Sequence, residues 1–167
     1  MNVVDASATD VMTQVRGQEL KGVLVPFYPA SNAFPALVDV VITAANGPGS
    51  IGVLRFWGHG ALDPDKAGFA TIRHDGGARL DLSTMLGPRA QAAMARLKPY
   101  FAPGARVEFK HCRVATPAGY EWLSNLAAQW GVEIHASPAL QQLCSWTGSV
   151  LSFKGGARPH PVRGIDP

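Results

Sequence analysis

The sequence has few cysteines, few charges and no long apolar run, and each shortage excludes a class of protein. Two cysteines, Cys112 and Cys144, among 167 residues are too few for a disulfide-stabilised secreted scaffold, so we expect reduced thiols. No window approaches the roughly 20 apolar residues of a membrane span, and no secretory signal starts the chain. We therefore expect a cytoplasmic protein, or one delivered to another cell without a cleavable signal.

Basic residues are too scattered to form a nucleic-acid site. The formal net charge is +3 and the isoelectric point is about 9.1, yet Lys and Arg form no stripe. We expect neither a nucleic-acid nor a membrane partner. A hydrophobic content of 47% is enough for one compact domain with its own core.

The chain divides into three regions of different composition. Residues 1–18 are polar with little periodicity, which predicts a flexible or loosely docked lead-in. Residues 19–155 carry the folded domain, and residues 156–167 read as a C-terminal tail.

Strand and helix patterns alternate through this domain. Short apolar runs predict strands over residues 23–27, 51–57, 106–111, 132–136 and 149–153. Helical spacing predicts helices over residues 32–45, 88–98 and 119–130, and residues 69–82 read as a β-hairpin. Pro26 lacks a ladder donor, which predicts that the first strand lies at a sheet edge or ends early. The alternation is typical of an α/β fold with a mostly parallel sheet between helices.

His59 stands between Gly58 and Gly60, directly after the strand predicted to end at Trp57. Small neighbours leave an imidazole and the adjacent amides open to a ligand. A tight turn without a function would also explain this motif when it is taken alone.

Cys112 lies at the end of another predicted strand, among Lys110, His111 and Arg113. Cationic neighbours favour the reactive thiolate over the thiol. Taken alone, however, a cysteine in this position is most often a buried structural residue.

The two motifs carry more information together. Neighbouring parallel strands end at the same edge of a sheet, which would bring His59 and Cys112 together. A thiol nucleophile needs a base within hydrogen-bond reach. Cys112 comes 53 residues after His59, close to the spacing of about 50 residues in caspases. The pattern predicts a cysteine hydrolase with a His59–Cys112 dyad and no cofactor or metal.

These motifs resemble the bacterial caspase-like cysteine peptidases, the clan of gingipain, clostripain and separase. The resemblance is carried by residues 51–60, which end in Gly-His-Gly, and by residues 103–115 around Cys112. The helix over 119–130 and the strand over 132–137 extend it. It implies a caspase-like three-layer sandwich and an endopeptidase that acts through a thioester acyl-enzyme, with an oxyanion hole formed by the amides of Gly60 and Cys112.

The resemblance also implies a cleft for a protein or peptide substrate. We expect Asp63, Arg113 and Trp146 to face it, with Trp146 as an apolar wall in the segment after the fourth strand. A bacterial effector or toxin domain would fit this description. Cys144 lacks a glycine-flanked base and is expected to be dispensable for chemistry.

Two other functions remain open from the sequence. One is a non-catalytic caspase-like module that binds a partner protein through the same cleft. The other is a different thiol-dependent hydrolase or transferase. A metal site is the less favoured reading because no pair of the candidate ligands has the usual spacing. These candidates are His59, His74, His111, Cys112 and His135.

Overall fold

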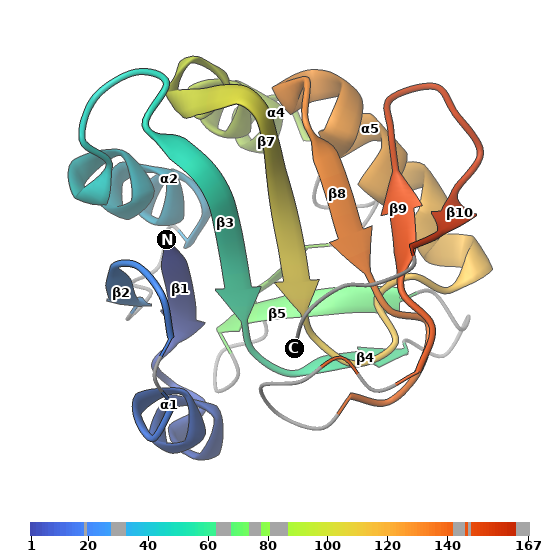
Figure 1. Ribbon diagram of the computed structural model, residues 1–167, viewed down its shortest axis with the longest axis horizontal. Helices are drawn as coiled ribbons and strands as arrows, with labels where there is room; N and C mark the ends of the chain where they lie inside the picture. Colours follow the sequence, from blue (N-terminus) through green and yellow to red (C-terminus); the bar gives the residue numbers. More distant parts are fainter. Residues whose placement is uncertain are drawn as a thin grey trace.

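The computed structural model describes residues 1–18, 20–27, 33–62, 68–73, 78–80, 87–141, 146 and 148–162. Its main element is a seven-stranded sheet with the strand order β10-β9-β8-β7-β3-β1-β2 (Figure 1). The strands are β1 (Asn2–Asp5), β2 (Leu24–Phe27), β3 (Ile51–Trp57), β7 (Phe101–Lys110), β8 (Glu133–Ala136), β9 (Leu151–Phe153) and β10 (His160–Pro161). The pairs from β2 to β8 are parallel, and β9 and β10 are added antiparallel.

Helices cover both faces of this sheet. Side chains of α2 (Ala33–Ala44), α4 (Pro88–Ala95) and α5 (Tyr120–Trp130) pack into the main core on one face, and Figure 1 shows α4 and α5 behind β7 and β8. Residues of α1 (Thr9–Arg16) pack on the other face in a smaller cluster with Val4 and Trp57. The predicted α/β class, with a mostly parallel sheet between helices, is confirmed.

A second, smaller sheet follows β3 directly. It contains β4 (Gly60–Leu62), β5 (Gly68–Arg73) and β6 (Ala78–Leu80), which pair antiparallel in this order. The β5–β6 pair confirms the hairpin, whose turn at residues 74–77 lies outside the described residues.

The expectation of a loosely docked lead-in is wrong. Asn2–Asp5 form an inner strand between β2 and β3, and all four residues are buried. Helix α1 packs against the sheet through one buried stripe, formed by Val11, Met12 and Val15. A strand of four residues is too short to show the alternation of apolar and polar residues by which strands are recognised in a sequence. The tail also begins in ordered structure, because His160–Pro161 pair with β9.

Two glycine-containing turns behave differently from each other. Gly131 ends α5 with φ 70°, the left-handed conformation expected of a residue after a helix C-terminus. Pro103 and Gly104, which were expected to precede a strand, lie inside β7 instead. There the register against β3 shifts between Ile51 and Val53, so the turn signal marks a bulge.

The edge position predicted for the strand that contains Pro26 is confirmed, since β2 is the last strand of the sheet. Among the described helices, none has the length and apolar character needed to cross a membrane.

Candidate active site

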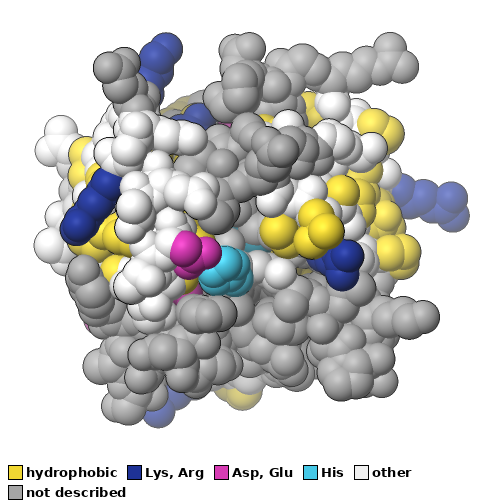
Figure 2. Space-filling model, turned by 90° about the horizontal axis from the view of Figure 1, so that it is seen from below, with side chains coloured by type: hydrophobic (Ala, Val, Ile, Leu, Met, Phe, Trp, Pro, Cys, Tyr) yellow, Lys and Arg dark blue, Asp and Glu magenta, His cyan; other side chains and the backbone are white. Residues whose placement is uncertain are grey.

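The predicted rim exists in the structure. β3 and β7 are adjacent and parallel, and Trp57 is in register with Lys110. His59 and Cys112 each follow two residues after this pair, so they leave the sheet at the same carboxyl edge. Figure 2 looks onto this rim and shows a histidine side chain against an acidic one.

Gly60 brings the histidine segment into contact with the cysteine segment. A Cβ atom at Gly60 would lie 2.0 Å from the carbonyl oxygen and 2.9 Å from the backbone nitrogen of Cys112. Side chains cannot occupy this space, so only glycine allows the approach. The close contact places the residue after His59 directly against the backbone of the candidate nucleophile.

His59 is engaged by an acidic residue that the sequence reading did not identify. Its Nε2 atom lies 3.1 Å from Oδ1 of Asp10, in the first turn of α1. Partial burial raises the pKa of Asp10, but the hydrogen bond and charge of His59 and the N–H of Val11 outweigh it, so the net pKa is lowered. With a carboxylate as acceptor, Nε2 carries the proton and Nδ1 is the basic nitrogen.

The sulfur of Cys112 is a free thiol with a backbone partner. The N–H of Gln141 donates to Sγ at 3.2 Å, and the thiol itself donates to the Gln141 carbonyl oxygen at 3.5 Å, a bond that is lost when the thiolate forms. A donor aimed at sulfur is the arrangement that stabilises a thiolate. Arg113, the next residue, has φ 56°, the one positive value of a non-glycine residue in the described backbone. Such a conformation is unfavourable for Arg and fixes the turn that presents the thiol.

The cationic neighbours of Cys112 point to different sides. Side chains alternate along a strand, so Lys110 and His111 lie on opposite faces of the sheet. His111 is buried against Phe109, with ring centroids 6.0 Å apart. Arg113 is exposed at the rim. Among the described residues, the Gln141 backbone donates to Sγ and accepts from it.

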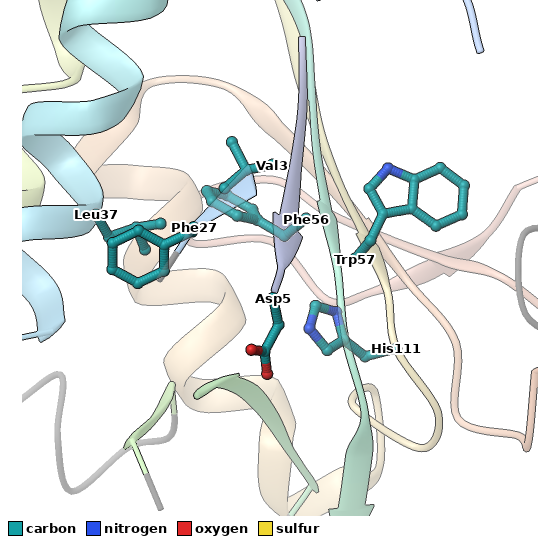
Figure 3. Close-up of a pocket in the computed structure, with 7 residues that line it drawn as sticks. All are labelled: Val3, Asp5, Phe27, Leu37, Phe56, Trp57 and His111. Atoms are coloured by element: carbon teal, nitrogen blue, oxygen red, sulfur yellow. The ribbon is translucent and has the colours of Figure 1, made fainter. Parts of the chain in front are cut away.

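His111 faces a small cavity that it shares with Asp5 (Figure 3). Asp5 is 3% exposed, and its Oδ1 accepts hydrogen bonds from the N–H and hydroxyl of Ser7. Its Oδ2 is buried and has no hydrogen-bond partner among the described residues. The volume in which the centre of a water molecule fits is about 10 Å³, which is room for about one water. Ordered water is therefore the simplest partner for this oxygen.

Lys110 belongs to a charged cluster on the other face. Glu108, 1% exposed, accepts from Arg55 at 2.8 Å and Arg106 at 2.7 Å, and Lys110 lies 3.6 Å away. Burial raises the pKa of Glu108, but the hydrogen bond from Arg106 and the cationic charges lower it below its usual value. Burial lowers the pKa of Lys110 from 10.5 to about 8.

The predicted substrate residues have different positions. Trp146 lies against the Lys110 ammonium, 4.1 Å from the ring centroid to Nζ, and is only partly exposed. Arg113 is exposed beside Cys112, and Leu140 is 62% exposed in the adjoining segment. Asp63, His74 and Cys144 lie outside the described residues, so the expectations for them stay predictions.

His135 is buried, and its Nε2 contacts Glu133 at 3.1 Å, as expected of a structural histidine. Within the described part of the chain, no three His, Cys, Asp or Glu side chains are grouped as metal ligands.

The sequence reading missed Asp5 and Asp10 because both lie in the supposed lead-in. Two signals could have identified this strand and helix. One is the apolar pair Val3 and Val4 just before Asp5, and the other is the helical spacing of Val11, Met12 and Val15.

Comparison with family models, with curated proteins and with solved structures gave no match to this chain.

Proposed function

We propose that the protein is a cysteine hydrolase of the caspase-like type, acting on a protein or peptide substrate. The observation that carries the proposal is the close approach of Gly60 to Cys112, which supports a site shared by the His59 and Cys112 segments. The three-layer α/β arrangement and the 53-residue spacing also fit. The sequence resemblance favours a peptidase.

In this mechanism, Nδ1 of His59 takes the proton from Sγ of Cys112 as the thiolate attacks a peptide carbonyl carbon. The C–N bond then breaks, the amine leaves with the proton from His59, and a thioester remains on Cys112. Water, deprotonated by His59, attacks the thioester carbonyl, and the C–S bond breaks to release the acid and the thiol.

Asp10 has the role of orienting the base. Its hydrogen bond to Nε2 fixes the ring and favours the tautomer in which Nδ1 carries no proton and acts as the base. Its carboxylate also stabilises the imidazolium formed when the thiolate appears.

The Cys112 surroundings supply the remaining parts. The Gln141 N–H stabilises the thiolate before attack. The amides of Gly60 and Cys112 are the proposed oxyanion hole, where loss of one donor typically slows catalysis by roughly 100- to 1,000-fold. Leu140 precedes Gln141 and Arg113 follows Cys112, and both side chains are exposed, so we assign them to the substrate-facing side of the site.

A peptide library incubated with the protein tests the proposal, with cleavage products sequenced by mass spectrometry. Cleavage that is lost in Cys112→Ala and His59→Ala, but kept in Cys144→Ser, supports it. A folded protein that cleaves no peptide but captures one equally well with and without Cys112 would instead identify the non-catalytic binding module. Ester or amide transfer without peptide cleavage would point to the other thiol-dependent class.

A further inference from the structure

Residues 137–141, which follow β8, are hydrogen-bonded to the segment that contains Cys112. Three N–H groups join the two segments: Gln141 to Sγ of Cys112 at 3.2 Å, Arg113 to the carbonyl of Ala139 at 2.9 Å, and Ala115 to the carbonyl of Ser137 at 3.0 Å. Ser137 also donates through its hydroxyl to the Ser149 carbonyl at 2.9 Å. The position of the N–H that serves the thiol therefore depends on where residues 137–141 are held.

Trp146 follows residues 137–141 in the sequence and contacts the sheet at Lys110. The Lys110 ammonium lies 4.1 Å from the centroid of the Trp146 ring and 5.7 Å from that of Trp57. An ammonium over an indole face is attracted by the ring, most strongly where water is excluded. The side chain of Lys110 is 5% exposed, so the contact is largely desolvated.

Glu108 does not require Lys110 as its only cation. Arg55 and Arg106 each contact one of its carboxylate oxygens at a shorter distance than Lys110 does. The cost of burying a lysine is therefore not explained by charge balance at Glu108 alone. The contact with Trp146 gives the ammonium a second role.

We propose that Lys110 is a positioning residue for the thiol, because its ammonium binds Trp146 and thereby holds residues 137–141 with the Gln141 N–H aimed at Cys112. The proposal rests on the proposed function of Cys112 as nucleophile, because the Gln141 N–H matters for catalysis only if it stabilises the Cys112 thiolate. Lys110 is the last residue of β7 and Cys112 follows it by two residues, so the end of one strand positions both the thiol and the cation that contacts Trp146.

Amide hydrogen exchange of the full chain, read by NMR at Arg113, Ala115 and Gln141, tests this arrangement without any assay of activity. We expect about tenfold faster exchange at these amides in Lys110→Met and in Trp146→Leu. Lys110→Arg and Trp146→Phe keep a cation over an aromatic ring and should restore slow exchange. Lys98→Met, at an exposed lysine before β7, is the matched control and should leave exchange unchanged.

Unchanged exchange in both disruptive variants would overturn the proposal, as would a change in Trp146→Leu that Lys110→Met does not share. Lys110→Met could fail to fold. In that case Trp146→Leu, which alters a residue outside the strands, is the deciding variant, and unchanged amide exchange in it overturns the proposal. The proposed function fails by a separate result, the absence of Cys112-dependent chemistry. A double variant should exchange no faster than either single variant, because the two side chains act through one contact.

Discussion

The backbone of Gly60 lies against that of Cys112 so closely that a Cβ atom would sit 2.0 Å from the Cys112 carbonyl oxygen. This contact joins the turn that carries His59 to the turn that carries the thiol. Neither β3 nor β7 alone brings the two turns this close. The site therefore depends on a residue with no side chain.

We expect Gly60→Ala to separate the two turns and to destabilise the fold by roughly 1–3 kcal/mol, since the added methyl group forces a backbone shift. Reactivity of Cys112 should fall in the same variant. Urea unfolding and alkylation rates measure the two effects. Gly52→Ala, where a Cβ meets nothing within 4 Å, is the control for loss of glycine in a strand. Equal behaviour of the two variants would show that the approach at Gly60 is dispensable.

Replacement of Asp10 by Asn should weaken the base without unfolding the protein, because the pair with His59 is largely exposed. We expect peptide cleavage to slow by up to roughly 100-fold, and the His59 ring to lose its preference for the Nε2–H tautomer in NMR spectra. Asp39→Asn removes an exposed partner of Arg96 far from the rim and serves as the control. If both variants cleave at the same rate, Asp10 has no part in catalysis.

Glu108 should contribute to stability above acidic pH. Its pKa is lowered in the folded state, so its contribution is present near neutral pH and is lost as pH falls through that lowered value. Glu108→Gln leaves the buried Lys110 and the partly exposed Arg55 and Arg106 without their carboxylate and should cost about 3 kcal/mol at pH 7. Unfolding measured at pH 7 and pH 3 should show the gap to the wild type shrinking in acid. Exposed Glu121→Gln should show neither effect.

The lysine of the same cluster predicts a second rise of stability with pH, in the alkaline range. The pKa of Lys110 is lowered by burial from 10.5 to about 8, so between these values the unfolded chain binds the extra proton. The free energy of unfolding should therefore rise with pH across this window, by up to roughly 3 kcal/mol. Lys110→Met should lack this rise in urea titrations from pH 7 to 10.5. A rise of the same size in both proteins would assign it to another group.

Strand–helix alternation was sufficient to predict the rim. The runs over β3 and β7 are long enough to be recognised, and parallel pairing places His59 and Cys112 at one edge whatever the details of packing. Local chemistry around the thiol was less predictable. The Gln141 N–H comes from 29 residues away, and no periodicity indicates that a backbone donor will reach Sγ.

Residues 2–16 show why the other parts were missed. β1 has only four residues, and its burial depends on β2 and β3 forming on either side of it. Asp10 gains its role only when α1 docks on Val4 and Trp57, which is a tertiary event. The contact between Lys110 and Trp146 joins residues 36 positions apart, and no local pattern indicates it.

Covalent labelling tests directly whether Cys112 is the nucleophile. The protein is incubated at neutral pH with a peptidyl chloromethyl ketone mixture, and modified residues are identified by mass spectrometry. We expect an adduct at Cys112 that forms faster than any at Cys144 and more slowly in His59→Ala, because the base and thiolate form one unit. Unfolding in urea should remove the difference between the two cysteines. Equal modification of both in the folded protein, unaffected by His59→Ala, would contradict the assignment of Cys112 as the nucleophile.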